Sequence, residues 1–233
     1  MDITSDAGAL NFALLAYQDW LRKDRPMGTD LKTRQFQKNC FILLDKLIYE
    51  YVMRQWKGSG DQKLAGNLES FSGETEVLTP TSRAKWDELL REIFDYSKVA
   101  DADISLSYMK PLLYHFYCLK NIQGPDSEYE IEIDHIIPQD CFKMSVIPRK
   151  EAVQNNLLNL GLLPKNENCS KGKKRLIELT DPWLKDQVKK YEFVDEMDYA
   201  LYSDIANQKG IFELRETLFY EAFGPRRDYI LNN

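Results

Sequence analysis

Long apolar runs are missing from this sequence, and none approaches the roughly 20 residues that a membrane-spanning helix needs. The first residues, MDITSDAGALNF, lack a basic segment ahead of an apolar stretch, so no secretory signal is expected. Cysteine is scarce as well: four are present, and none belongs to a Cys-x-x-Cys pair of the kind that binds zinc. These absences predict a cytoplasmic protein with reduced thiols that does not span a membrane.

An excess of positive charge is also lacking. The 31 basic and 37 acidic side chains leave a net charge of −6, which argues against a protein that coats nucleic acid with its whole surface. Basic residues are nevertheless concentrated between Lys143 and Arg175, where eight of them stand against two acids. Such a segment is either a solvated helix surface or a phosphate-binding face, and charge alone does not separate the two.

Most of the chain shows the three- and four-residue spacing of apolar side chains that is typical of amphipathic helices. The pattern predicts helices over about 7–22, 31–56, 80–98, 104–120, 182–190 and 208–223. A stretch with four glycines among polar residues, 57–79, instead favours an exposed loop. The expected organisation is an N-terminal helical region at 1–60, a flexible loop or linker at 61–80 and a helical body at 81–233.

The helical period gives way to strict alternation in the segment YEIEIDH, which predicts a short half-buried strand. The strand ends at Asp134 and His135, because Pro138 cannot continue a central strand. A second apolar run, Leu157 to Leu163, can pair with it, and a helix is expected after Pro164. The result is strand, loop, strand, helix inside a mostly helical chain.

Polar residues gather around this predicted unit. An Asp-His pair at a strand end is, by itself, either a solvated end or part of a site. Asn159 in the second strand and Asn168 in the early helix can converge on that end, and amide oxygens together with a carboxylate suit a hard cation. His135 is the best available base, because a histidine pKa of about 6.5 allows it to take a proton from water at neutral pH.

These residues resemble the HNH (His-Me finger, ββα-metal) endonucleases. The sequence DHIIPQ at 134–139, followed by the two asparagines, is similar to the HNH domain of CRISPR effector nucleases. It resembles even more the HNH half of GmrSD-type Type IV restriction endonucleases, through NLGLL at 159–163 and NCSKG at 168–172. The resemblance covers about 129–176 and implies an α+β, mostly α protein with a two-stranded ββα-metal module embedded in a helical body.

The resemblance also implies the chemistry, which is metal-dependent hydrolysis of DNA phosphodiester bonds. His135 would be the general base, and Asn159 would accept a hydrogen bond from its other ring nitrogen. Asp134 and Asn168 would hold one Mg²⁺ or Mn²⁺ ion. The lysines that flank the predicted metal helix are expected to contact DNA phosphates: Lys165, Lys171, Lys173 and Lys174.

GmrSD-type enzymes also carry a ParB-like nucleotide-hydrolysing half with a DGQQR motif, and neither that motif nor a GxxxxGK[ST] loop occurs in this sequence. The resemblance therefore implies the nuclease part of a prokaryotic restriction or anti-phage defence system, with a ParB-like domain or subunit as a candidate partner. Two alternatives stay open. One is a non-catalytic, partner-binding subunit that keeps the HNH fold as a scaffold, and the other is a metal-dependent RNase.

Overall fold

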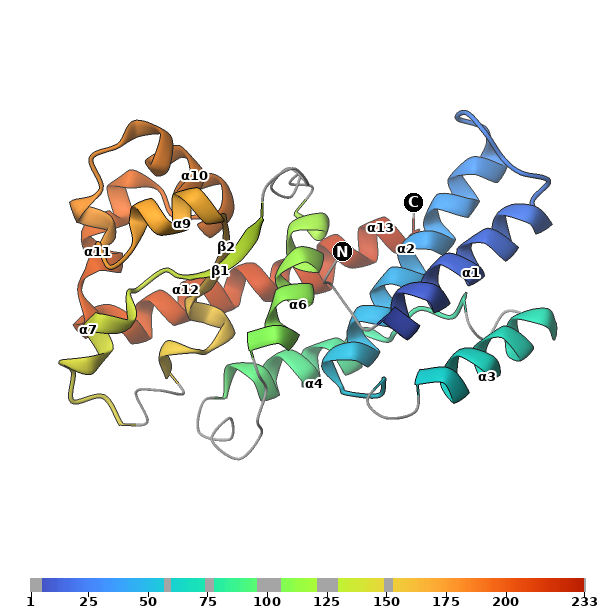
Figure 1. The fold of residues 1–233 in the computed structure, drawn as a ribbon, viewed down its shortest axis with the longest axis horizontal. Helices are drawn as coiled ribbons and strands as arrows, with labels where there is room; N and C mark the ends of the chain where they lie inside the picture. The colour runs from blue at the N-terminus through green and yellow to red at the C-terminus, as the bar shows by residue number, and fades with distance from the viewer. Residues whose placement is uncertain are drawn as a thin grey trace. The chain divides into compact units, whose positions relative to one another are not determined.

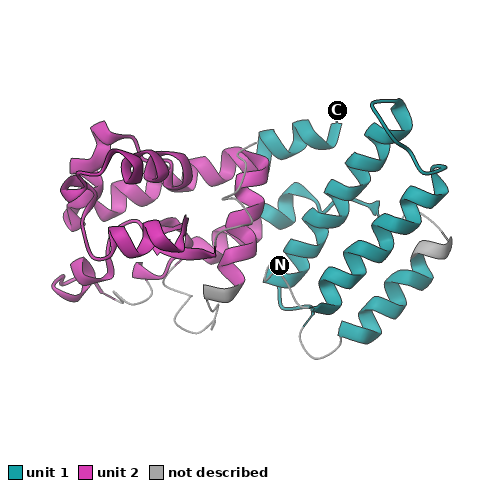
Figure 2. Cartoon of the chain, turned by 45° about the horizontal axis from the view of Figure 1, so that its top comes forward, with its two compact units in different colours: residues 1–86, 223–233 teal, residues 87–222 magenta. Residues whose placement is uncertain are grey.

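The computed structural model describes residues 6–56, 60–73, 78–95, 106–120, 130–148 and 153–232. The chain divides into two compact units, residues 1–86 with 223–233 (unit 1) and residues 87–222 (unit 2), shown in Figure 2. Helices make up most of both units, and the sheet found in the described part of the chain has two strands. The protein is thus α+β and mostly α. No helix among the described residues is long and apolar enough to cross a membrane.

Unit 1 is built around three long helices, α1 (Asp6–Arg22), α2 (Leu31–Val52) and α3 (Gly60–Gly73), of which α1 packs against the other two (Figure 1). The Asp30 side chain begins α2 by accepting a hydrogen bond of 2.7 Å from the backbone N–H of Thr33. One cluster of the core between the helices consists of two buried leucines with partly buried side chains against them: Leu15, Leu43, Phe12, Ala16, Leu68 and Leu78. The sequence predictions for α1 and α2 are confirmed.

The prediction of a flexible loop at 61–80 is wrong for its larger part, because α3 occupies Gly60–Gly73. One face of α3 is half-buried through Leu64 and Leu68. Asn67 on the same face donates a hydrogen bond of 3.0 Å to Asn11 of α1. A short helix rich in polar residues and glycine is marginal alone, so packing against α1 decides its structure. Residues 74–77 of the expected linker lie outside the described residues.

A buried ion pair joins the two stretches of chain that make up unit 1. Arg227, in α13 (Arg227–Asn232), donates from Nε and Nη2 to the two carboxylate oxygens of Asp45 at 2.8 and 2.6 Å. The indole of Trp86 donates to the same carboxylate at 3.2 Å. All three side chains are buried. The bidentate geometry and the added donor satisfy charges that would be costly to bury unpaired.

Unit 2 begins within α4 (Arg83–Phe94) and contains a further set of helices and short turns around the sheet (Figure 1). In chain order these are α6 (Leu106–Leu119), β1 (Ile131–His135), α7 (Gln139–Lys143), η2 (Leu157–Asn159), β2 (Leu160–Pro164), α9 (Lys165–Lys171), η3 (Leu176–Glu178), α10 (Pro182–Glu192), η4 (Glu196–Asp198), α11 (Tyr199–Ser203), η5 (Ile205–Asn207) and α12 (Gln208–Glu221). A π-helical turn, η6 (Ala222–Arg226), links α12 to α13. Phe116 of α6 stacks on Phe219 of α12, with ring centroids 4.3 Å apart, in the core of this unit.

The two strands are antiparallel, in a register that pairs His135 with Leu160 and Asp134 with Gly161. Every residue of β2 is buried, and α6 and α10 pack against it. Among the described residues β2 pairs with β1 alone, and side chains bond part of its remaining backbone. The hydroxyl of Tyr117 accepts a 3.0 Å hydrogen bond from the Leu162 N–H, and Arg215 donates to the Leu160 carbonyl at 3.0 Å.

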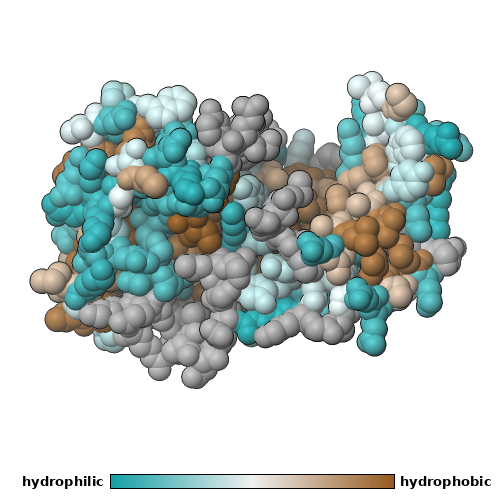
Figure 3. Space-filling model, in the orientation of Figure 1, coloured by the Kyte–Doolittle hydropathy of each residue, from teal (hydrophilic) through white to brown (hydrophobic). Residues whose placement is uncertain are grey.

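The surfaces of the two units differ in the view of Figure 3. Hydrophilic side chains cover most of the visible face of unit 2, whereas apolar side chains gather on part of unit 1. Three large apolar side chains of α1 are exposed: Leu10, Tyr17 and Leu21. The polar unit 2 is the one that carries the residues predicted to form a site.

Candidate active site

The end of β1, the helix α7 and the later part of α9 with the residues after it line one cavity in unit 2. Its volume is about 240 Å³, and its lining includes Asp134 and His135 from β1 and Asn168 from α9. The strand β2 runs antiparallel to β1 and continues directly into α9. Because α9 packs against β1, Asn168 lies near the end of that strand. Three of the four residues that the sequence singles out for catalysis and metal binding therefore share one cavity.

His135 meets two side-chain amides at the same ring nitrogen. Its Nε2 lies 3.0 Å from Oδ1 of Asn155 and 3.1 Å from Nε2 of Gln139. The oxygen accepts and the amide nitrogen donates, so each neighbour stabilises a different tautomer. In the tautomer that donates to Asn155, Nδ1 has no proton and can act as a base.

The surroundings of His135 keep the imidazole neutral. Burial lowers the pKa of His135 below its ordinary value, and the charge of Lys171 lowers it further. The hydrogen bond to Asn155 and the charge of Asp134 oppose this shift without reversing it. An imidazole with a lowered pKa is neutral at neutral pH, and the neutral form is the one that accepts a proton from water.

Asn159 does not make the contact that the resemblance implies. Its amide bonds the peptide of Ile137 instead, with Oδ1 accepting from the N–H at 2.9 Å and Nδ2 donating to the carbonyl at 3.1 Å. A third bond, of 2.9 Å, runs from Nδ2 to the carbonyl of Gln154. Asn159 ends η2, just before β2, and so faces the loop after His135. The expected bond to the ring is wrong, and the amide that contacts the ring belongs to Asn155.

Lys171 is also placed differently from the prediction. Its side chain is fully buried, so it cannot contact DNA as expected. The ammonium group forms ion pairs with Asp134 and, at 2.8 Å, with Glu192, and it donates to the carbonyl of His135 at 3.2 Å. Burial alone would lower the pKa of Lys171, but the attraction of the two carboxyl groups outweighs it, so the net shift is upward. The lysine therefore stays charged and neutralises Asp134.

Glu192, the last residue of α10, is a member of the site that the sequence analysis missed. Gly161, which pairs with Asp134 in the sheet, makes room for it, since a Cβ at this position would lie 2.9 Å from Cγ of Glu192. Burial raises the pKa of Glu192 well above its ordinary value, with the charge of Lys171 opposing the shift. No local sequence signal marks Glu192, because 58 positions of chain separate it from Asp134.

The donor atoms in the cavity fit a hard divalent cation that is bound together with substrate. Asn168 donates from Nδ2 to Glu132 at 2.8 Å, which leaves its Oδ1 as the remaining acceptor. With the carboxylate of Asp134 this makes two oxygen donors, and Mg²⁺ commonly takes its other ligands from water and phosphate. No cluster of three or more His, Cys, Asp or Glu side chains that could hold a metal occurs within the described residues. Only one of the two donors, Asp134, is charged, so a cation would bind weakly before substrate supplies its phosphate oxygens.

The other predicted DNA contacts are exposed. Lys165 pairs with Glu130 at 2.6 Å, and Lys174 donates to the backbone carbonyl of Ser170 at 3.1 Å. Lys173 is 82% exposed at its side chain and lines the cavity. These three lysines have the exposure that contact with a phosphate requires.

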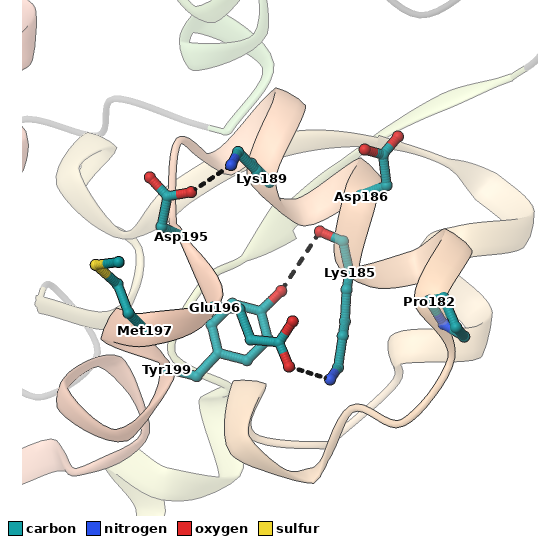
Figure 4. A pocket seen from close by; sticks show the side chains of 8 residues that line it. All are labelled: Pro182, Lys185, Asp186, Lys189, Asp195, Glu196, Met197 and Tyr199. Carbon is teal, nitrogen blue, oxygen red and sulfur yellow. Dashed lines mark hydrogen bonds and ion pairs between the residues drawn. The ribbon is translucent and has the colours of Figure 1, made fainter.

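A second cavity of unit 2, of about 460 Å³, lies between α10 and the segment that leads into α11 (Figure 4). Lys189 pairs with Asp195 at 2.7 Å, and Lys185 pairs with Glu196. The hydroxyl of Tyr199 donates to the backbone carbonyl of Lys185 at 3.4 Å, and burial raises the pKa of Tyr199 to about 12. The lining of this cavity holds neither histidine nor cysteine, and both of its lysines are paired with carboxylates.

Comparisons of the chain with protein-family models, with curated proteins and with solved structures give no match in any of the three. The fold and the cavity at the end of β1 define the site by the chemical groups that it brings together. A two-stranded antiparallel sheet and the helix after it bring an imidazole, a carboxylate and an amide together. Any inference about function starts from the chemistry of these three groups.

Proposed function

We propose that this chain is a metal-dependent HNH-type endonuclease that hydrolyses DNA phosphodiester bonds. The observation that carries the proposal is the single cavity lined by His135, Asp134 and Asn168 at the junction of β1 and α9. A neutral base beside two hard oxygen donors is what metal-assisted phosphodiester hydrolysis needs. The resemblance of DHIIPQ at 134–139 to HNH enzymes supports the same conclusion.

In this mechanism His135 removes the proton from the attacking water. Asn155 accepts a hydrogen bond from the N–H at Nε2, the one ring proton of the neutral imidazole, which keeps Nδ1 available as the base. When bound, a Mg²⁺ or Mn²⁺ ion held by Asp134 and Asn168 would stabilise charge on the phosphate and on the departing oxygen. The chain's own contribution is the orientation of base and ligands in one cavity.

Two buried residues act as positioning residues. Asn159 holds the peptide of Ile137 from both sides, so the chain that follows His135 has a fixed course. Lys171 bonds both the carboxylate of Asp134 and the backbone carbonyl of His135, which ties the base to the metal ligand. Preorganisation of this kind is how a weak cation site becomes productive once substrate arrives.

The substrate and the biological setting belong to the same proposal. The exposed Lys165, Lys173 and Lys174 are suited to phosphates on the DNA backbone. Following the resemblance to GmrSD-type enzymes, we place the chain in prokaryotic restriction or anti-phage defence, in the cytoplasm, with a ParB-like domain or subunit as its partner.

The test is cleavage of supercoiled plasmid with Mg²⁺, with Mn²⁺ and with chelator. The native chain is compared with His135→Ala and Asn168→Ala, and Lys189→Ala serves as a control in the second cavity. We expect nicking that needs metal, falls by a factor of about 100 or more in both site variants and is unchanged in the control. Equal activity of His135→Ala and the native chain would contradict the mechanism.

One observation favours a second candidate, a partner-binding subunit that keeps the module only as a scaffold. Lys171 already neutralises Asp134, as expected of a site that has no metal to bind. The same assay decides between the candidates, with an RNA substrate added. Metal-dependent cleavage of RNA alone would identify an RNase, and absence of cleavage of either nucleic acid in the presence of the partner would identify a scaffold.

A further inference from the structure

Two lysines from different segments converge on one carboxylate at the rim of the candidate active site. Asp140 in α7 contacts Nζ of Lys143 through Oδ1, at 2.5 Å, and Nζ of Lys173 through Oδ2, at 3.0 Å. Lys173 follows α9 and lies thirty positions after Lys143 in the sequence. All three side chains line the cavity that holds His135 and Asn168. The ammonium groups are thus held beside the predicted catalytic groups.

The arrangement matches the acceptor pattern of a nucleic-acid backbone. A phosphodiester has one negative charge shared by two non-bridging oxygens, just as the Asp140 carboxylate does, and lysine is a common point-charge partner of phosphate. We propose that Lys143 and Lys173 form the binding site for the backbone phosphate next to the cleaved bond, and that Asp140 occupies this site until substrate displaces it. This inference rests on the proposed nuclease function; it adds Lys143 to the substrate contacts and makes Asp140 the group that the substrate displaces.

Because the three side chains are exposed, displacing the Asp140 carboxylate costs little free energy. The side chains of Lys143 and Lys173 are 66% and 82% exposed, and that of Asp140 is 36% exposed. Ion pairs of this kind contribute little to stability, so a phosphate can replace the carboxylate without disturbing the fold. Other exposed acids of unit 2, such as Glu130 and Asp195, each pair with one lysine instead of bridging two.

The test measures binding of a fluorescent DNA duplex by anisotropy, in chelator so that no cleavage occurs. Four variants are compared with the native chain: Asp140→Asn, the double variant Lys143→Ala with Lys173→Ala, the triple variant that combines all three changes, and Asp195→Asn. The last removes the same charge from an ion pair that does not line the cavity. Circular dichroism confirms that each variant is folded.

We expect Asp140→Asn to tighten binding about two- to fivefold, because the Asp140 carboxylate no longer competes with the phosphate for the two lysines. The double variant should bind roughly tenfold more weakly at moderate salt, and the slope of log K against log salt should become shallower by about one, because the two lysines hold one phosphate. The triple variant should bind like the double variant, and Asp195→Asn like the native chain. The dependence of the Asp140 effect on the two lysines is the signature of a shared site.

A tightening by Asp140→Asn that persists without the lysines would overturn the inference, because it would reflect only the general loss of negative charge. An unchanged affinity in every variant would also overturn it, while His135-dependent cleavage of plasmid by the native chain would leave the nuclease proposal standing. A native chain that neither binds nor cleaves DNA would refute both.

Discussion

At the scale of single residues, the ion pairs around Lys171 are the most constrained part of the site. Lys171 and Glu192 are fully buried, and Asp134 is 4% exposed. A buried charge is tolerated only while its partners remain, and removal of one partner exposes the full cost of desolvation of the others. The side chains of Lys171, Asp134 and Glu192 therefore act as one unit with the backbone at His135.

Lys171→Met should destabilise the protein by about 3–5 kcal/mol, since Asp134 would be left as an uncompensated buried charge. Glu192→Gln should cost less, because burial raises the pKa of Glu192 and favours the neutral form that glutamine imitates. Urea unfolding gives the free energies, with Lys174→Met as the exposed control. The interpretation fails if Lys171→Met unfolds at the same urea concentration as that control.

The titration of His135 provides a prediction about pH. Its pKa is lower in the folded chain, which therefore binds fewer protons than the unfolded chain between the folded pKa and about 6.5. The free energy of unfolding should rise with pH through this window and decline as pH falls through it. NMR of the two histidine rings in the metal-free protein measures the pKa directly, and His135→Gln assigns the signal.

Asn155→Asp provides the matching change at the ring. A carboxylate in place of the amide oxygen stabilises the imidazolium, so the pKa of His135 should rise by about one unit or more. The contact of 3.0 Å between Asn155 and Nε2 is the basis of this expectation. A pKa that does not move in this variant would show that Asn155 does not hold the ring.

At the scale of elements, the sheet and α10 depend on close packing at Gly161. The buried strand β2 lies against α10. At Gly161 the side chain of Glu192 occupies the space that a Cβ atom would need. Gly161 pairs with Asp134 in the sheet, and Lys171 bonds both Asp134 and Glu192. One small residue in β2 thus permits the ion pairs that orient the end of β1.

Gly161→Ala should destabilise the protein by about 1–3 kcal/mol and reduce cleavage, because the added Cβ would push Glu192 away from Lys171. Gly210→Ala is a matched control in α12, where a Cβ meets nothing within 4 Å and alanine is the better helix former. Thermal unfolding should show a lower midpoint for the first variant and an equal or higher one for the second. The reverse order would argue against the packing described for β2.

At the scale of the whole molecule, the chain forms two compact units, and a buried ion pair joins the two chain segments of the first. Asp45 and Arg227 are 182 positions apart in the sequence, and both lie in unit 1. Three of the four tryptophans, Trp20, Trp56 and Trp86, belong to this unit as well. Tryptophan fluorescence therefore reports mainly on unit 1.

Arg227→Ala should lower the stability of unit 1 by about 3–5 kcal/mol, because Asp45 would lose its bidentate partner in a buried site. Arg83→Ala removes an exposed pair with Asp228, whose contact is 3.3 Å, and should cost less than about 1 kcal/mol. Both are measured as shifts of the fluorescence-detected urea transition. Equal shifts would mean that the buried pair does not hold the unit together.

The sequence by itself determined the mostly helical class, the two strands and the neighbourhood of Asp134, His135 and Asn168. Apolar periodicity predicts these features because each helix or strand turns one face towards the core. The position of a polar motif at a strand end follows from the residues next to it in the sequence. The same signal failed for α3, whose few apolar residues form a helix only by packing against α1.

The tertiary structure alone decided which polar groups meet. That Asn155 rather than Asn159 contacts the ring depends on the course of the loop before β2, and no periodicity encodes that course. Lys171 turned inward because two carboxyl groups, one of them on distant α10, attract its ammonium more strongly than solvent does. Burial and long-range charge are properties of the folded molecule, since they arise only when segments far apart in the sequence come into contact.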